Sequence, residues 1–337
     1  MTELTDSQRQ AVTTDSRDVL VIAGAGSGKT RVLTERIKHL LTNCGASASD
    51  MLVLTFTRKA AAEMQSRLLA TLGEGAERQL RGMLIGTFHS IALHILRAEG
   101  EVLGYNAKSI TILDPDDADL LLKQCCSDLG YLHGKKWKGV TWKAVQAARE
   151  GRYHIGVACP EGASDPIRRI LAEYDRQMFA LNVMDFGKIL SECHRLLHEH
   201  PEVLERWRQR IKHVLVDELQ DTDEVQYRLH GFFAPPATFF GVGDRRQSIY
   251  GFRGSRPDLM TEQHPDAEII DLRECFRCGD RIIKAANSLI GHNDDTLAQP
   301  MIGATGRIGD VVPMPGRSAN ISEIIGEEHT GLADTYR

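Results

Sequence analysis

The sequence lacks several features that define whole classes of protein. Its 337 residues contain no apolar run near the ~18 residues that a membrane-spanning helix needs, so we expect no membrane partner. Repeats and low-complexity segments are also missing. Basic charge is not in excess, because 41 Lys and Arg face 46 Asp and Glu, for a net charge of -5. No global positive field therefore indicates a nucleic-acid partner, although a groove needs only local positive charge.

Cysteine patterns typical of metal sites are scarce as well. The chain has seven Cys and no recognisable signal peptide, which favours unpaired thiols in a reducing, cytoplasmic compartment. Cys275 and Cys278 spell C-x-x-C, but no second pair at zinc-finger spacing accompanies them, and Cys193 beside His194 is poor geometry for one metal. This disfavours a metal or redox function. The hydrophobic fraction of 42% is enough for a substantial core and two domains.

A glycine-rich segment follows the first predicted strand. Residues 23–30 read AGAGSGKT, directly after the apolar run 18–22 and before a predicted helix at 31–41. This is the setting of a phosphate-binding loop, in which backbone N–H groups face an anion, the lysine reaches the β and γ phosphates and the threonine hydroxyl ligates Mg²⁺. An ordinary glycine turn is the alternative, since the strict pattern has a glycine at position 23. The predicted nucleotide contacts here are Ala23, Gly24, Ala25, Gly26, Ser27, Gly28, Lys29, Thr30 and Arg31.

A pair of carboxylates follows a second apolar strand. Residues 212–223 read KHVLVDELQDTD, and at the carboxyl end of a parallel strand such a pair lies beside the phosphate loop. There Asp217 can hold Mg²⁺, and Glu218 can orient or deprotonate the attacking water. A solvated helix start is the alternative, and it explains Asp221 and Asp223 better than Asp217.

A third strand repeats this arrangement. Residues 239–254 read FFGVGDRRQSIYGFRG, an apolar strand and a turn that place Gln247 where a γ phosphate could be sensed. Arg245 and Arg246 follow Asp244. These two cations either strengthen nucleotide binding close to the phosphates or face solvent or DNA, and the sequence leaves both interpretations open.

These segments belong to a longer ordered series. In chain order the segments are LTDSQRQAV (4–12), AGAGSGKT (23–30), LTFTRKAAAEM (54–64), GTFHSIALHILR (86–97), VLVDELQDTD (214–223), VGDRRQSIYGFRGS (242–255) and LRECFRC (272–278). The chain resembles the amino-terminal half of a superfamily 1 DNA helicase of the UvrD/Rep/PcrA type, and the match covers most of residues 1–290. The resemblance implies an ATP-dependent motor that moves 3′ to 5′ on single-stranded DNA.

The resemblance also implies a role for each matching residue at the nucleotide. Gln8 corresponds to the glutamine that reads adenine, and Arg36 to an arginine that packs near it. Phe276 aligns with an aromatic that stacks on the base, and Arg277 with the arginine that reaches the γ phosphate. Such an arginine is worth about 10³ to 10⁵ in turnover, whereas the alternative, a surface salt bridge, would contribute roughly 0–1 kcal/mol. The implied catalytic residues are Glu218, Gln247 and Arg277, the metal ligands Thr30 and Asp217, and the cofactors ATP and Mg²⁺.

Other matching residues point to single-stranded DNA. An aromatic ring stacked on a base contributes about 1–3 kcal/mol and tolerates any sequence, which suits a motor. Phe252 stands where the family commonly has tryptophan. Core packing is the alternative for Phe88 and Phe252. The DNA contacts that the resemblance implies are Thr57, Thr87, Phe88, His89, Tyr250, Phe252 and Arg253.

A basic cluster lies within residues 133–154. Contact with duplex DNA is one interpretation, and a solvated helical face with two tryptophans folded inward is the other. The sequence leaves both open. The cluster consists of Lys135, Lys136, Lys138, Lys143, Arg149 and Arg152, interleaved with Trp137 and Trp142.

The periodicity divides the chain into blocks. We predict an α/β fold, in which residues 1–95 and 207–280 form a RecA-like ATP-binding lobe with a parallel sheet and residues 96–206 form an inserted all-helical subdomain. Residues 281–337 read as the start of a truncated second lobe or a tail, with a strand at 310–314 that has lost its sheet. The expected function is that of a helicase or translocase whose second lobe comes from a protein partner or a second copy. The alternative is an ATP- and single-stranded-DNA-binding module without autonomous unwinding.

Overall fold

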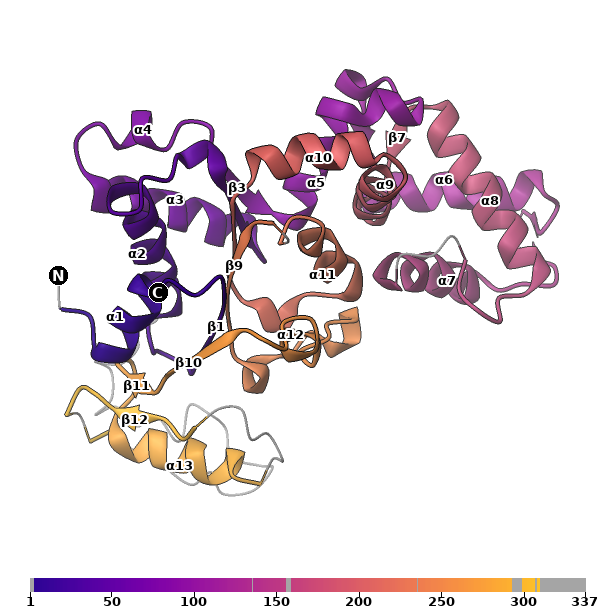
Figure 1. The fold of residues 1–337 in the computed structure, drawn as a ribbon. Helices are drawn as coiled ribbons and strands as arrows, with labels where there is room; N and C mark the ends of the chain where they lie inside the picture. Colours follow the sequence, from indigo (N-terminus) through magenta and orange to yellow (C-terminus); the bar gives the residue numbers. More distant parts are fainter. Residues whose placement is uncertain are drawn as a thin grey trace.

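A parallel sheet forms the centre of the chain (Figure 1). The computed structural model describes residues 3–134, 136–155, 159–234, 236–292, 299–306 and 308–309. The sheet has six strands in the order β10-β1-β9-β8-β2-β3, and each neighbouring pair is parallel. This confirms the predicted α/β fold with a RecA-like parallel sheet. The strands are β1 (Asp18–Ala23), β2 (Met51–Thr55), β3 (Leu84–Thr87), β8 (His213–Val216), β9 (Thr238–Gly243) and β10 (Glu268–Leu272).

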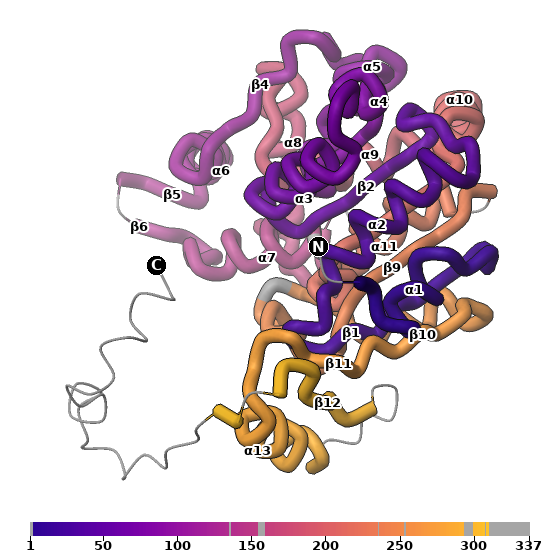
Figure 2. Tube along the Cα trace, turned by 90° about the vertical axis from the view of Figure 1, so that its left-hand side faces the viewer, coloured from indigo at the N-terminus to yellow at the C-terminus, as the bar shows by residue number. Residues whose placement is uncertain are grey.

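Helices cover both faces of this sheet (Figure 2). Side chains of a strand point alternately to opposite faces, so Val19 and Val21 of β1 join one apolar cluster while Leu20 and Ile22 join the other. Near-continuous apolar runs such as β1 are typical of parallel strands that are buried on both faces. The first face is covered by α1 (Asp6–Thr13), α2 (Lys29–Thr42) and α3 (Arg58–Leu72). The second is covered by α5 (Phe88–Glu99), α9 (Phe186–Glu199), α10 (Pro201–Arg210), α11 (Glu224–Gly231) and α12 (Leu259–Glu262).

The residues between α5 and α9 build a separate small core, to the right of the sheet in Figure 1. This core joins Leu122 of α6 (Pro115–Asp128), Val145 of α7 (Trp142–Ile155) and Tyr174 of α8 (Asp165–Ala180). Helix α6 begins as its sequence predicts, because Asp114 accepts the backbone N–H of Asp117 at 2.9 Å and proline occupies the first turn.

Short elements complete the described residues. Two-residue strands pair β4 (Thr111–Ile112) with β7 (Val183–Met184), and β5 (Leu132–His133) with β6 (Lys136–Trp137), where successive helices were expected. The hydrophobic periodicity of the sequence does not predict these strands, because two residues are too few to show a repeating pattern. The sheet edge strand β10 also has no predicted counterpart, because Glu268 and Asp271 interrupt its apolar pattern. The small helix α4 spans Ala76–Gln79.

A small unit follows the sheet. Strand β11 (Glu274–Cys275) pairs in parallel with β12 (Ile302–Gly303), and α13 (Asp280–Ile290) lies between them in sequence and beside them in space (Figure 1). The strand expected at 310–314 and the helix expected at 321–329 lie outside the described residues. No helix in the described ranges is long and apolar enough to cross a membrane.

Candidate functional site

The three polar segments predicted to form one site meet at one edge of the sheet. Strands β1, β9 and β8 are adjacent in the order of the sheet, and all three are parallel. Their carboxyl ends therefore lie side by side, as in open α/β sheets that bind ligands at this edge. The glycine-rich loop follows β1, the carboxylate pair follows β8, and Gln247 follows β9.

Two glycines of the loop adopt a backbone that other residues avoid. Gly26 has φ of 74° and Gly28 has φ of 90°, in the left-handed region that favours glycine. Space is also restricted: a Cβ on Gly26 would lie 2.6 Å from Cβ of Arg277, and one on Gly28 would lie 3.1 Å from Nε2 of Gln8. The loop leads directly into α2, whose N-terminus is suited to an anion.

Lys29 belongs to a closed ring of side chains. Its Nζ donates to Oε1 of Gln247 at 3.0 Å, and Nε2 of Gln247 donates to Oδ2 of Asp244 at 2.6 Å. The backbone N–H of Asp244 donates to Oε1 of Gln220 at 2.9 Å, and Nε2 of Gln220 donates to Oε2 of Glu218 at 2.9 Å. The ring closes where this Glu218 oxygen lies 3.4 Å from Nζ of Lys29. The loops after three strands are thereby joined.

Gln220 is a residue of this ring that the motif reasoning did not single out. It is buried, and a Cβ on Gly243 would lie 2.8 Å from its Oε1, so the glycine at the end of β9 makes room for it. Its backbone carbonyl accepts the hydroxyl of Ser248 at 3.2 Å. The only sequence signal is its position two residues after Glu218.

The carboxylates after β8 are crowded. Asp217 is 4% exposed, and burial, with the nearby charge of Glu218, raises its pKa from 3.8 to about 6. Burial and Glu218 likewise raise the pKa of Asp221 to about 6. Glu218 itself has φ of 50°, which is uncommon for a residue other than glycine. The side chain of Glu218 is paired with the ammonium group of Lys29.

Gln8 is tied to the loop. Its Nε2 donates to the carbonyl of Ser27 at 2.8 Å, and its Oε1 accepts the N–H of Thr5 at 3.2 Å in a capping box. The start of α1 is therefore linked directly to the residue before Gly28.

Arg36 occupies a different place from the one expected beside a base. Its guanidinium is buried and donates to the carbonyls of Val12 and Thr14, each at 2.8 Å, while its carbon lies 5.6 Å from the ring centre of Phe240. Arg36 thus ties α2 to the end of α1 inside the core. The arginine side chain is long, so the sequence does not predict which groups its guanidinium contacts.

Phe276 and Arg277 lie directly against the loop. The backbone N–H of Phe276 donates to the carbonyl of Gly26 at 2.9 Å, and the Phe276 side chain is exposed. The close approach of Arg277 to Gly26 places its side chain beside the same turn. Both residues predicted to contact nucleotide from outside the sheet are therefore adjacent to the loop.

The two arginines after Asp244 separate. Arg246 lines a cavity of about 170 Å³ together with Gly24, Gln247 and Asp271, so it faces the phosphate loop. Arg245 instead lies within electrostatic range of Asp258. Of the two cations, Arg246 is therefore the one that lies beside the phosphate loop.

Most of the residues expected at DNA line one cavity of about 680 Å³. Phe252 is 82% exposed, which excludes core packing as its role. Its ring lies 6.0 Å from that of Tyr250, which lies 4.7 Å from that of Phe56. The expected residues in this cavity are Thr57, Thr87, Phe88, His89, Tyr250 and Phe252, and the side chain of Arg253 lies outside the described part of the chain.

Phe88 differs from Phe252, because it is only 3% exposed and belongs to the apolar core. Core packing, the alternative interpretation, therefore describes its environment. Thr57 and Thr87 act as helix N-caps, accepting the N–H groups of Ala60 at 3.0 Å and Ser90 at 3.2 Å. The N-termini of α3 and α5 consequently open toward the cavity, and such ends favour anions.

The cavity has walls that the motif reasoning missed. Phe56 precedes Thr57 in a matched segment, Tyr153 comes from α7, and Phe186 is the first residue of α9. The ring of Phe186 lies 6.0 Å from that of His89, edge to face. Asp221 also lines the cavity, so the turn that follows the carboxylate pair reaches both sites.

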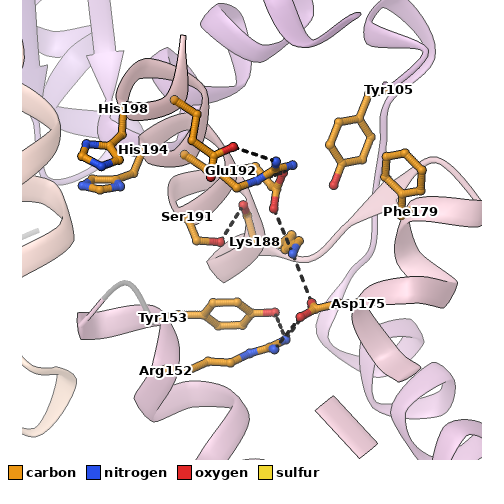
Figure 3. Close-up of a pocket in the computed structure, with 12 residues that line it drawn as sticks. Tyr105, Arg152, Tyr153, Asp175, Phe179, Lys188, Ser191, Glu192, His194 and His198 are labelled. Atoms are coloured by element: carbon orange, nitrogen blue, oxygen red, sulfur yellow. Dashed lines mark hydrogen bonds and ion pairs between the residues drawn. The ribbon is translucent and has the colours of Figure 1, made fainter. Parts of the chain in front are cut away.

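A further cavity of about 520 Å³ lies between α7, α8 and α9 (Figure 3). Its charges are matched: Arg152 pairs with Asp175 at 2.8 Å, Lys188 with Glu192 at 2.9 Å, and Arg195 with both Glu192 and Glu199. The three basic and three acidic side chains that line this cavity are thus paired with one another.

The basic cluster at 133–154 is partly internal. Besides Arg152, Arg149 pairs with Asp119 at 2.9 Å. Trp137 and Trp142 lie 5.8 Å apart and pack against the small helical core. These contacts favour the interpretation with tryptophans folded inward, with Lys136, Lys138 and Lys143 left at the surface.

A parallel sheet with a glycine-rich loop, a carboxylate pair and a glutamine on three adjacent strands defines a phosphate-loop α/β lobe. Residues 4–268 match the UvrD/REP helicase N-terminal domain, and the chain belongs to this family. It is 36% identical to the ATP-dependent DNA helicase Rep of Salmonella typhimurium over 97% of this chain and 48% of the relative. It is also 36% identical to the ATP-dependent DNA helicase UvrD1 of Mycobacterium tuberculosis, over 86% of this chain and 39% of that protein. The chain thus spans about half the length, or less, of these curated relatives.

Proposed function

We propose that the chain binds ATP with Mg²⁺ and single-stranded DNA, and acts as an ATP-dependent DNA helicase or translocase when a second motor lobe is present. The observation that carries this is the closed ring around Lys29, which joins the phosphate loop to Glu218 and Gln247. The names of the relatives support it, since they are ATP-dependent DNA helicases. The 3′ to 5′ polarity rests on the resemblance alone.

The ring indicates how the residues would respond to a triphosphate. Lys29 would exchange its two present partners for the β and γ phosphates, since a cation is best placed on the larger negative charge. Glu218 and Gln247 would then be left facing the γ phosphate, Glu218 to accept a proton from the attacking water and Gln247 to orient it. Arg277, beside Gly26, would neutralise the transferred charge, and Phe276 would stack on the base.

The donor set fits Mg²⁺. Asp217 is a buried carboxylate with a raised pKa. A nearby cation would stabilise its ionised form. Thr30 lies in the first turn of α2 and offers a hydroxyl. Two protein oxygens suffice, because Mg²⁺ keeps several waters and uses substrate phosphates, and no cluster of three or more His, Cys, Asp or Glu positioned for a metal occurs in the described residues. When bound, Mg²⁺ neutralises developing charge on the phosphates.

The aromatic cavity is the proposed DNA site. The exposed ring of Phe252, next to Tyr250, offers a stacking surface for any base, and the capped N-termini of α3 and α5 offer sites for backbone phosphates. Asp221 lines this cavity and accepts a hydrogen bond from Gln220 at 3.3 Å. We assign the turn Leu219–Asp221 as the link through which nucleotide state reaches DNA.

A binding module without autonomous unwinding is the second candidate, since the ring around Lys29 and the aromatic cavity would serve binding alone equally well. Unwinding requires two lobes with alternating grips, and the second would come from a partner, a second copy or further residues of a longer protein. In this proposal residues 1–95 and 207–280 form the ATP-binding lobe, 96–206 the helical subdomain and 281–337 the start of the second lobe. We place the protein in the cytoplasm.

ATP hydrolysis by the purified chain, measured with and without single-stranded DNA, tests this function. We expect DNA-stimulated hydrolysis that Glu218→Gln abolishes while ATP still binds, because an amide keeps the shape but does not accept the proton. Glu63→Gln, at an exposed position of α3, is the matched control. If Glu218→Gln hydrolyses ATP like the wild type, Glu218 is not the base. Robust strand separation by a proven monomer would refute the need for a second lobe.

A further inference from the structure

Two cysteines enclose the pair of residues that we assign to the nucleotide. Cys275 ends β11, the backbone bends through residues 276–278, and α13 begins at Asp280. Phe276 and Arg277 are therefore the whole of the segment between the two thiols. No metal cluster uses either cysteine in the described residues, and all seven cysteines are unpaired.

The two thiols stand three residues apart, and the backbone bends between them at residues 276–278. Burial, with the charge of the nearby Cys275 thiol, raises the pKa of the Cys278 thiol. The backbone around Cys275 is fixed, because its carbonyl accepts the N–H of Ala304 at 3.1 Å. Disulfide bonds need thiols brought together in this way by the backbone.

Changes at this pair reach the phosphate loop directly. A Cβ on Gly26 would lie 3.1 Å from Sγ of Cys275 and 2.6 Å from Cβ of Arg277. The N–H of Phe276 donates to the carbonyl of Gly26. The segment from Cys275 to Cys278 is thus packed against the turn that would hold the phosphates.

From these contacts we infer that Cys275 and Cys278 form a reversible dithiol–disulfide couple that controls nucleotide binding. The inference rests on the proposed function of Phe276 and Arg277. A disulfide between them closes a small ring around these two residues and changes the bend that holds Phe276 and Arg277 against Gly26. In reducing compartments disulfides of this kind are transient and sensing rather than structural.

The oxidant is a low-molecular-weight disulfide, such as glutathione disulfide. Cys278 is partly exposed whereas Cys275 is 1% exposed, so the Cys278 thiolate attacks the small disulfide and releases one small thiol. Cys275 then loses its proton and attacks the mixed disulfide, forming the internal bond and releasing the second small thiol. The two protein thiols lose two electrons and two protons, and the small disulfide gains them. Since the pKa of Cys278 is raised, the reaction accelerates as the pH rises above neutrality.

Peptide mapping tests the bond without reference to ATP. Trypsin cleaves after Arg273, Arg277 and Arg281, which places the two cysteines in separate peptides. After equilibration with glutathione disulfide and alkylation of free thiols, we expect these peptides to appear as one linked species lighter by two hydrogens. Dithiothreitol separates them. If both peptides remain alkylated under strongly oxidising glutathione, the inference is wrong.

Nucleotide affinity tests the consequence. We expect oxidation to weaken binding of a Mg²⁺-bound, non-hydrolysable ATP analogue by about tenfold or more in the wild type, and dithiothreitol to restore it. Cys278→Ser should bind equally under both conditions, while Cys44→Ser, at an exposed site, should behave like the wild type. Disulfide formation with unchanged affinity would overturn the control of nucleotide binding. Failure of the reduced protein to bind the analogue would instead refute the proposed function, with the mapping result unaffected.

Discussion

The substitution Asp217→Asn removes the negative charge of a carboxylate that is buried in the metal-free protein. Burial and Glu218 raise the pKa of Asp217 from 3.8 to about 6. Because each pKa unit corresponds to about 1.4 kcal/mol, the ionised carboxylate destabilises the metal-free fold by about 3 kcal/mol at neutral pH. Asparagine keeps the oxygen that accepts the N–H of Glu218 at 3.1 Å. The free energy of unfolding of the variant should therefore exceed that of the wild type by up to about 3 kcal/mol.

The effect depends on pH with a definite sign. Well above pH 6 the carboxylate is ionised in both the folded and the unfolded chain, so the stabilisation by asparagine is fully present. As the pH falls from about 6 to about 4 the folded carboxyl binds its proton first, which stabilises the wild type and removes the difference. Mg²⁺ with an ATP analogue should reverse the ranking, because only the wild type gains ligand stabilisation.

Urea unfolding followed by circular dichroism measures this difference. The experiment compares wild type, Asp217→Asn and the control Asp266→Asn, an exposed turn residue, at about pH 8 and about pH 4.5. The control should unfold like the wild type at both values. If Asp217→Asn is less stable than the wild type at about pH 8 without metal, the buried charge is not unfavourable and the argument for a cation at Asp217 fails.

Three other outcomes are expected. Gly26→Ala should lose affinity for an ATP analogue, measured by calorimetry, because the added Cβ displaces Arg277. The control Gly75→Ala, at similar φ with open space around it, should lose only about 1–2 kcal/mol of stability from its backbone conformation. Equal analogue affinities of the two variants would contradict this. Phe252→Ala should weaken single-stranded DNA binding by about 1–3 kcal/mol in fluorescence anisotropy with little change in stability, while Phe88→Ala should cost about 3–5 kcal/mol of stability, and the reverse pattern would refute both assignments. His264, stacked 3.8 Å from Phe239, has its pKa lowered to about 4 by burial, so wild-type stability should fall as the pH drops below about 6.5; His264→Phe should flatten that loss in urea titrations, and an unchanged pH profile would exclude this histidine.

The parts of the site that the sequence predicts are those fixed by local geometry. A strand followed by AGAGSGKT determines the turn and the helix start within a few residues. Asp217, Glu218 and Gln247 follow strands whose adjacency a parallel sheet requires. For these residues, the position in the sequence relative to a strand is enough to predict the position in space.

The remaining features depend on tertiary contacts. Arg36 ends on two carbonyls of α1, and Gln220 joins two loops only because β8 and β9 are neighbours. Phe88 and Phe252 are the same residue type, yet one lies in the core and the other is exposed. Arg152 is internal because α8 supplies Asp175. Composition and periodicity contain none of these pairings.

Calorimetric titration of a non-hydrolysable ATP analogue with Mg²⁺ most directly tests whether the ring around Lys29 is a triphosphate site. The comparison is between wild type, Lys29→Ala and Lys59→Ala, an exposed lysine of α3. We predict that wild type and Lys59→Ala bind alike, and that Lys29→Ala loses about tenfold or more in affinity because the phosphates lose their direct cation. Equal affinity of wild type and Lys29→Ala would contradict the assignment of this site.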